Sequence, residues 1–463
     1  MKSIVIPLAM IAMAGCVQFK PRPLDALKQA DALENRTLAD SGLRQYIETN
    51  LHRSFPSWPP PAWDLETLTF AAFYFSSDLA VARANYDAIA AGTITAAQRP
   101  NPTLGVSPAY NTTASVPSPW LVTATLDLPI ETAGKRGHRI AQARHLSDAA
   151  GFALATAAWD VRARLRRTLI DLWSAQETVS LLQQQQSAQE DIVRLLEKEF
   201  AAGGISQAEV TRERIAREQA RLALLDAESR RAQARAQLAG VISVPTRALD
   251  DAVISFEFFN QAPDPLPADG ARRRALLNRT DIFGALAQYA AAESALRLEI
   301  AKQYPDLHLS PGYEFDQGDN KWGVGLSLEL PILNHNRGPI AEAEARRHES
   351  AAKFNALQAR VLSEVEIALA GCNNARQKLA AAETILEESG KHERATLEMF
   401  KAGEVSGQAV AAARLERATA ALAQFDARLK AQQAFAVLEG ALQTPLELPA
   451  PLVAPTTDRS FRP

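Results

Sequence analysis

The chain has 463 residues, a formal net charge of −3 and a sequence pI near 6.2. This near-neutral balance excludes the strongly basic surface with which nucleic-acid-binding proteins neutralise phosphates, so we expect no nucleic acid partner. A mean hydropathy of −0.15 excludes a bundle of apolar membrane helices, whereas strands of alternating character can cross a bilayer at that average.

The first residues are typical of an export signal. A single Lys2 precedes an apolar run over residues 4–13, which is too short to span a bilayer and ends in small residues before Cys16. Small residues directly before a cysteine resemble the lipobox of bacterial lipoproteins, although Met13 stands where that motif usually has leucine. We predict a signal peptide over residues 1–15 and a covalent lipid on Cys16; the alternative is ordinary cleavage beside an incidental cysteine. The other cysteine, Cys372, lies in a helical stretch, so no disulfide is expected.

Helices are expected to dominate the first half of the chain. Residues 16–63 are predicted to be a lipid-anchored tether with weak helical content and an extended, proline-rich end. Asp64 is a helix cap, and residues 64–92 predict one helix because apolar side chains recur at three- and four-residue steps. A hairpin is expected at about residues 102–130. A helix of about seventy residues then begins at residue 135, roughly 100 Å long at 1.5 Å per residue. Gly203 and Gly204 end it, and a return helix follows.

The second half of the chain repeats this order. After a connector at residues 243–279 we expect a helix at 280–303, a hairpin at 304–332 and a second long helix at 339–401. Gly403 interrupts the helical pattern, and a return helix is predicted at residues 406–443. The remaining residues, 444–463, are rich in proline and are predicted to be an extended tail.

The hairpin at residues 304–332 alternates apolar and polar residues with a period of two. One face of its first strand would carry Leu307, Leu309, Tyr313 and Phe315, and one face of its second Trp322, Val324, Leu326, Leu328 and Leu330. Residues 317–320 have turn composition. Such alternation predicts strands with one apolar and one polar face, about as long as a tilted strand that crosses a bilayer. A soluble antiparallel sheet would alternate in the same way, so the pattern alone leaves both possibilities open.

The two halves match in sequence as well as in order. Residues 102–110 match residues 305–313, Trp120 matches Trp322, and LDLPI at 126–130 matches LELPI at 328–332. The F-x-A-G-x-x-S stretches at 200–206 and 400–406 also correspond. The offset stays near 200 residues throughout, so we predict two structural repeats, over residues 64–242 and 280–443. Four strands cannot close a barrel, and lipid does not tolerate open sheet edges, so a membrane sheet would require several copies.

These residues resemble the TolC-like outer-membrane efflux protein family, and specifically its lipoprotein branch. The hairpins with their LDLPI and LELPI endings, the Arg-Gly pairs that begin the long helices, the glycine-containing tips and the lipobox carry the resemblance. It implies a mainly α fold with a transmembrane β-barrel, in which a homotrimer supplies four strands per subunit to twelve strands and the long helical hairpins form a periplasmic α-barrel. The implied location is the outer membrane of a Gram-negative bacterium.

The resemblance also implies partners and site residues. A periplasmic adaptor would contact the tips, here Gly203, Ser206, Gly403 and Ser406, and would couple them to an inner-membrane pump, often of the resistance-nodulation-division class. No catalytic residue, metal or cofactor is implied beyond the lipid on Cys16. Some relatives close the periplasmic aperture with aspartates, but those places fall on Ala409 and Ala412. Glu209 and Glu404 are the nearest substitutes, or else solvated carboxylates at helix starts.

Four further residues can be interpreted either as functional or as purely structural. Trp120 and Trp322 open the second strand of each hairpin, and we predict that they anchor a barrel at the membrane interface rather than pack in a core. His138 and His335 lie at hairpin-to-helix junctions without companions at ligand spacing, so a polar turn is favoured over a metal site.

Two other functions compete with an efflux conduit. The chain would be a lipid-anchored coiled-coil scaffold or adaptor if its hairpins formed a soluble sheet, and type I protein secretion uses a similar outer-membrane conduit. An enzyme is not expected, because the sequence has no phosphate-binding loop and no nucleophile elbow. The cargo cannot be read from the sequence.

Overall fold

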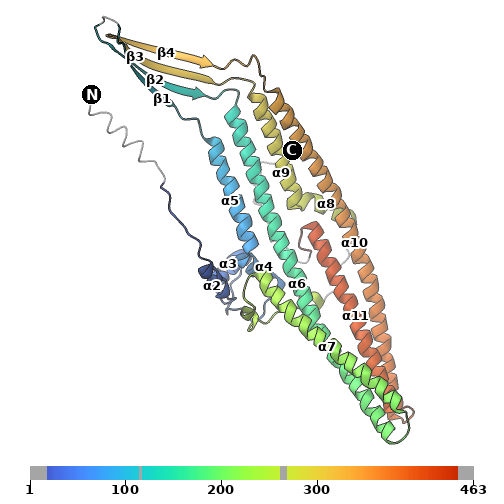
Figure 1. The fold of residues 1–463 in the computed structure, drawn as a ribbon. Helices are drawn as coiled ribbons and strands as arrows, with labels where there is room; N and C mark the ends of the chain where they lie inside the picture. Colours follow the sequence, from blue (N-terminus) through green and yellow to red (C-terminus); the bar gives the residue numbers. More distant parts are fainter. Residues whose placement is uncertain (1–17, 114–116, 261–267, 447–463) are drawn as a thin grey trace.

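The computed structural model describes residues 18–113, 117–260 and 268–446. The helices run along an elongated molecule. The strands lie at one end, and the turns that join the long helices to their return helices lie at the other (Figure 1). Cys16, the predicted signal peptide and residues 447–463 lie outside the described residues. Among the described helices, none is both long enough and apolar enough to cross a bilayer.

The element order contains the same series twice. The first half comprises α2 (Ala26–Glu34), α3 (Ser41–Leu51), α4 (Leu65–Phe75), α5 (Ser77–Ala97), β1 (Thr103–Tyr110), β2 (Trp120–Ile130), α6 (Lys135–Ala201) and α7 (Gln207–Ile242). The second comprises α8 (Ala268–Asn278), α9 (Thr280–Ala301), β3 (Leu307–Asp316), β4 (Asp319–Leu328), α10 (Arg337–Lys401) and α11 (Gly407–Leu442). The series α4 to α7 therefore corresponds to the series α8 to α11.

The short helices lie end to end along the long ones. In Figure 1, α5 lies beside the part of α6 nearest the strands and α7 beside the part nearest the tip, and α9 and α11 lie along α10 in the same way. Close packing also joins the halves, because α9 and α11 both contact α6. In each repeat, two shorter helices together therefore match the length of one long helix.

The sequence-based prediction of one helix over residues 64–92 is wrong. The helix breaks at Ser76, whose ψ of 120° is extended, and the Ser76 hydroxyl caps α5 by accepting a hydrogen bond from the Leu79 amide. A search for apolar periodicity misses such a break because the period resumes after a single residue. In the second repeat the corresponding break lies at Arg279, with a ψ of 127°.

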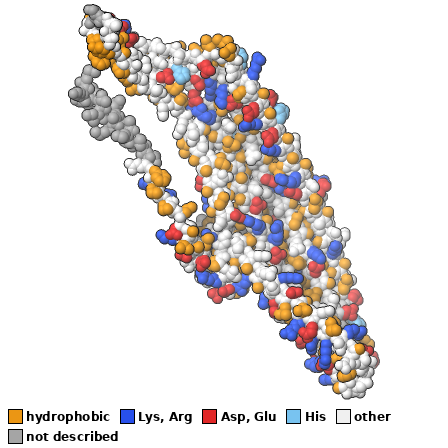
Figure 2. Space-filling view, viewed as in Figure 1, with side chains coloured by type: hydrophobic (Ala, Val, Ile, Leu, Met, Phe, Trp, Pro, Cys, Tyr) orange, Lys and Arg blue, Asp and Glu red, His pale blue; other side chains and the backbone are white. Residues whose placement is uncertain are grey.

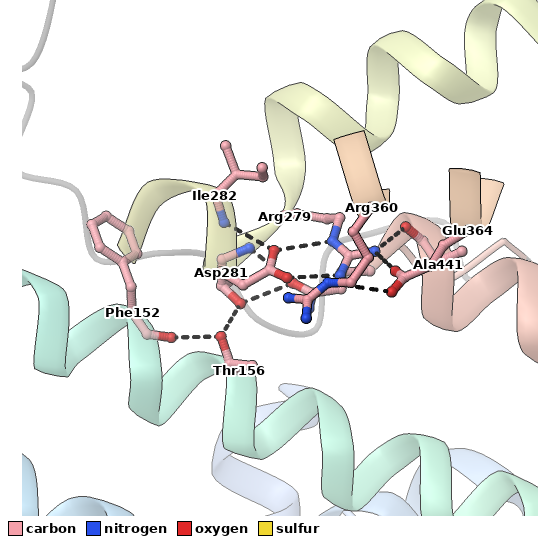
Figure 3. A network of polar contacts seen from close by, with 10 residues as sticks. Phe152, Thr156, Arg279, Asp281, Ile282, Arg360, Glu364 and Ala441 are labelled. Atoms are coloured by element: carbon pink, nitrogen blue, oxygen red, sulfur yellow. Dashed lines mark hydrogen bonds and ion pairs between the residues drawn. The ribbon is translucent and has the colours of Figure 1, made fainter. Parts of the chain in front are cut away.

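An arginine ties the neighbouring helix ends together at each break. Arg36 donates to the carbonyl oxygens of Phe75 and Ser243, at 2.9 and 2.8 Å. Figure 3 shows Arg279 between Asp281 and Glu364, with Nη1 also 3.0 Å from the carbonyl oxygen of Ala441. Because carbonyls at helix ends have no partner within their own helix, these guanidinium groups satisfy acceptors that burial would otherwise leave unpaired.

The largest core lies at mid-length, where α4, α6 and α7 meet the N-terminal segment. Leu43, Ile47 and Trp63 are at most 1% exposed and pack with α6 residues such as Leu165. The Trp63 amide also donates to the carbonyl oxygen of Val253 at 2.8 Å. The N-terminal segment thus packs against the helices, because α3 presents apolar residues at a helical spacing and Trp63 continues the same core.

The strands form one antiparallel sheet in the order β1-β2-β3-β4, with β1 and β4 at its edges. The turn between β3 and β4 consists of Gln317 and Gly318, with φ values of 51° and 124°. The predicted turn over residues 317–320 was therefore too long, and β4 begins at Asp319. It ends at Leu328, so Leu330 lies outside the strand, contrary to the prediction.

Candidate functional site

The sheet has one apolar and one polar face, as the alternation predicts. The cross-strand pairs Tyr110↔Trp120, Ala124↔Tyr313 and Tyr313↔Trp322 place the apolar residues of all four strands on one side. That face carries Leu104, Val106, Tyr110, Trp120, Val122, Leu126, Leu128, Leu307, Leu309, Tyr313, Phe315, Trp322, Val324, Leu326 and Leu328. In Figure 2, hydrophobic side chains gather at this end of the molecule, whereas charged side chains are spread over the helices.

Trp120 and Trp322 occupy equivalent places on the apolar face. Each contacts the tyrosine opposite, with ring centroids 5.1 Å apart for Tyr110 and Trp120 and 4.9 Å apart for Tyr313 and Trp322. Both tryptophans are exposed, at 51% and 82%. They lie near the end of the sheet that is remote from the helices; Trp120 is the first residue of β2 and Trp322 the fourth residue of β4. Their role as membrane anchors remains a prediction.

The polar face carries a group of side chains that the sequence did not bring together. Asp127 Oδ2 lies 3.0 Å from His308 Nδ1, and the Ser310 hydroxyl donates to Asp127 at 3.1 Å. Asp127 and His308 each lie on the polar face of their own hairpin. Their contact depends on the β2–β3 register, which joins the two repeats and cannot be read from either hairpin alone. Glu314 and Asp316 also lie on this face, and Glu329 is exposed just beyond β4.

An open recess lies where the polar face meets the helices. Its volume is about 490 Å³, and its lining includes Arg99, Glu131, Arg139, Asp306 and His308. Arg139 donates to Glu131 at 2.6 Å, and this hydrogen bond raises the pKa of Arg139. The recess thus combines positive and negative charges at the base of the sheet, and Glu131, Arg139, Asp306 and His308 in its lining already have partners.

Asp306 fixes the corner between β2 and α6. It accepts hydrogen bonds from Lys135 Nζ at 2.8 Å and from the Thr132 amide at 2.9 Å. Partial burial opposes ionisation of Asp306, but the hydrogen bonds from Lys135 and Thr132 outweigh it and hold its pKa below the ordinary value. The side chain of Lys135 is only 10% exposed, so this ion pair joins the start of α6 firmly to the start of β3.

The two helical tips share one backbone geometry. Gly203 and Gly403 have φ values of 76° and 78°, in the left-handed region that favours glycine. The next amides, of Gly204 and Glu404, each donate to a carbonyl oxygen five residues earlier at 2.9 Å. These are Schellman motifs, in which a glycine after the last helical residue satisfies otherwise unpaired carbonyls. Their signal was readable, because glycine recurs at the same place in both repeats.

Serine begins the return helix after each tip. The hydroxyls of Ser206 and Ser406 accept hydrogen bonds from the amides of Glu209 and Ala409, both at 3.4 Å. The Glu209 carboxylate in turn accepts from the Ser206 amide at 3.2 Å, which completes a capping box. Glu209 thus has a structural partner within its own helix start, while Glu404 is exposed in the second tip. Their role at an aperture, and that of the tips toward an adaptor, remain predictions.

The two tips pack against each other. Ile192 and Leu196 of α6, Val210 of α7 and Ala411 of α11 form a small buried cluster, and Gly407 approaches Leu195. The helix pair α6–α7 and the helix pair α10–α11 therefore end side by side, at the end of the molecule opposite the sheet (Figure 1).

The described residues contain no group of three or more His, Cys, Asp or Glu side chains that could hold a metal ion. Near the predicted polar turn around His335, Asn336 adopts a φ of 57° and donates to the carbonyl oxygen of Glu299 at 2.7 Å. The junction is thus built by hydrogen bonds to the end of α9.

Comparison with known proteins identifies relatives of this chain. The cobalt-zinc-cadmium resistance protein CzcC of Cupriavidus metallidurans is 26% identical over 223 residues, which are 48% of this chain and 52% of that protein. The pyoverdine export outer membrane protein OpmQ of Pseudomonas aeruginosa is 30% identical over 159 residues, or 32% of each. The matched parts thus span about half of the first relative and a third of the second.

A solved structure has the same fold. The outer membrane protein VceC of Vibrio cholerae superposes with a TM-score of 0.65 at 18% identity, over 82% of this chain and 95% of that chain. Residues 75–243 and 271–443 each match the family described as outer membrane efflux protein, and together they make up well over half of the sequence. The chain therefore belongs to the outer membrane efflux protein family.

Proposed function

We propose that this protein is the outer-membrane channel component of a tripartite efflux system, in which three copies form a passive conduit. The observation that carries the proposal is the two-faced sheet with two open edges at the end of helices of 67 and 65 residues. Helices of that length span about 100 Å, enough to continue a membrane pore far into the periplasm.

In this conduit the two faces of the sheet meet different environments. The apolar face meets lipid, and the polar face, with Thr125, Asp127, Glu314 and Asp316, lines water. The edges β1 and β4 pair with neighbouring copies, because unpaired backbone groups are costly in lipid. Three copies of a four-stranded sheet supply the twelve strands of the proposed barrel. Catalytic residues have no place in this function, because a pump supplies the energy.

The partners follow from the two ends of the molecule. A lipid on Cys16 would hold the N-terminal segment to the outer membrane. At the other end, the turns with Gly203, Ser206, Gly403 and Ser406 would meet a periplasmic adaptor, which couples to an inner-membrane pump of the resistance-nodulation-division class. The two curated relatives are named for cobalt-zinc-cadmium resistance and for pyoverdine export, so membership of the family does not by itself define the cargo.

Reconstitution tests the proposal. Purified full-length protein should migrate as a heat-sensitive trimer and produce discrete conductance steps in planar bilayers. A protein that stays monomeric and forms no pores would instead be a lipid-anchored scaffold. Copurification of the pump from cells separates drug or metal efflux from type I protein secretion, because the two conduits join different inner-membrane transporters.

A further inference from the structure

The polar face of the sheet carries a histidine beside a carboxylate. Of the histidines in the sequence, His308 is the one that lies in the described strands, and its side chain is 41% exposed. Its Nδ1 atom lies 3.0 Å from Asp127 Oδ2 of β2. Histidine is the side chain that ordinarily changes its charge between pH 5 and pH 8. The pair therefore carries either no net charge or one negative charge, at a defined place on the face.

Hydrogen bonds hold the carboxylate of this pair in place. The residue pairs between β2 and β3 skip Pro311, which has no amide hydrogen to donate. Beside this interruption, the Ser310 hydroxyl donates to the Asp127 carboxylate at 3.1 Å. Side chains of β3 thus hold Asp127 from two positions, so that its charge stays next to His308.

The charged groups on the elements around His308 keep their charges over this pH range. Directly opposite it, β2 and β4 carry Pro129 and Ser327, which do not titrate. Besides Asp127, the charged groups of the surrounding segments are those of Arg99 before β1, Glu131 after β2, Asp306 before β3, Glu329 after β4, and Lys135 and Arg139 on α6. Four of these form the ion pairs Lys135–Asp306 and Arg139–Glu131. Carboxylates ordinarily stay ionised above about pH 5, and guanidinium groups stay charged throughout, so the main change between pH 5 and pH 8 is at His308.

We propose that the pair of Asp127 and His308 is a determinant of ion selectivity in the conduit, and that His308 makes this selectivity depend on pH. The inference rests on the proposed function, which places the polar face in the lumen, and adds to it the residues that set the charge at one level of the lumen. A neutral His308 leaves the negative charge of Asp127 facing the lumen in each of three copies, whereas a protonated His308 cancels it. Cations are therefore favoured over anions more strongly at pH 8 than at pH 5.

The salt concentration sets the size of this effect. At 0.1 M salt the Debye length is about 10 Å, so an ion within that distance of the lumen wall still feels its charges. We expect the ratio of K⁺ to Cl⁻ permeability to be about threefold higher at pH 8 than at pH 5 in about 0.1 M KCl, because three copies change charge together. In about 1 M KCl, where the Debye length is about 3 Å, the difference should shrink.

Reversal potentials in planar bilayers measure this ratio for the full-length protein. His308→Gln and His308→Asn keep the charge of Asp127 at either pH, so both variants should have the selectivity of the wild type at pH 8 throughout. Asp127→Asn removes one negative charge per copy, so at pH 8 it should match the wild type at pH 5. The matched control is His335→Gln, which removes an exposed histidine beyond the strands and should retain the pH shift of the wild type.

Equal wild-type selectivity at pH 5 and pH 8 would overturn the proposal, as would an undiminished pH shift in either assembled His308 variant. An Asp127→Asn pore that is as selective for cations at pH 8 as the wild type would also overturn it, because the pair would then not act on the permeating ions. In each of these cases, discrete conductance from heat-sensitive trimers would leave the proposed function standing. A wild-type protein without any conductance would overturn the proposed function itself, and this inference with it.

Discussion

Arg162 and Arg166 lie one turn apart on α6, and both pair with Glu439 of α11. All three side chains are at most 3% exposed, and the Arg166 guanidinium also lies about 5 Å from the rings of Phe258 and Phe435. The carboxylate joins the long helix of one repeat to the return helix of the other. Buried ion pairs of this kind contribute little net stability relative to apolar residues, but loss of one partner leaves a charge in a low-dielectric core.

The substitution Glu439→Gln should lower the free energy of unfolding by about 3 to 5 kcal/mol, because it removes the buried carboxylate that pairs with both Arg162 and Arg166. Denaturant titration in detergent, followed by helical circular dichroism, measures the loss. Glu404→Gln, in an exposed tip, is the matched control and should change stability by less than about 0.5 kcal/mol. Equal unfolding midpoints for the two variants would contradict the structural role of Glu439.

The Asp306 carboxylate makes the corner between β2 and α6 sensitive to acid. Its folded-state pKa lies below the ordinary value of about 3.9, so its stabilising effect is complete above that pH and is lost as pH falls through the lower folded-state pKa. Hydrogen-exchange protection of the Thr132 amide should therefore hold at pH 5 and fall in stronger acid. In Asp306→Ala protection should already be reduced at pH 5. A variant as well protected as the wild type at that pH would show that Asp306 does not hold the corner.

At the scale of elements, the sequence predicts structure best where a local signal marks an end. Glycine and serine at the tips predict both reversals, because a left-handed residue and a helix cap are local requirements. The break at Ser76 was missed, since apolar periodicity continues across it. The contact of Asp127 with His308 could not be predicted for another reason, because it depends on the pairing of strands from different hairpins, between residues 181 positions apart.

A substitution at Gly203 tests whether the first tip requires a residue with a positive φ. Gly203→Val should destabilise the first tip by about 1 to 2 kcal/mol, because a β-branched residue must adopt a positive φ. No atom lies within 4 Å of an added Cβ, so the effect is conformational rather than a clash. Hydrogen exchange of the tip amides and copurification of the adaptor measure it.

Gly137→Val is the control for this effect. Gly137 is an exposed residue of the first turn of α6, has equally open space, and lacks a positive φ, so valine should be tolerated there. If the two variants have equal tip protection and equal adaptor capture, the left-handed glycine is not required.

For the whole molecule, the repeat was more informative than any single motif. It predicted two hairpins and four long helices in the correct order, and the structure adds a two-helix lead-in to each half. The number of copies and the seams between them are properties of an assembly and leave only indirect traces in one chain. Those traces are two open sheet edges and an apolar face that the helices do not cover. They argue for an environment that supplies both lipid and neighbouring strands.

Lysine substitutions at two adjacent residues of β1 can distinguish a sheet that lies in a membrane from a soluble sheet. Val106 lies on the apolar face and Ser107 on the polar face, in the middle of the strand. If the apolar face meets lipid, Val106→Lys should cost about 2 to 4 kcal/mol near the bilayer centre and reduce the heat-sensitive oligomer in outer-membrane fractions. Ser107→Lys places the same charge in the lumen and should assemble normally, with altered ion selectivity in planar bilayers. A soluble sheet would tolerate lysine at an exposed Val106 as well as at Ser107, so equal assembly of the two variants would argue that this sheet does not enter a membrane.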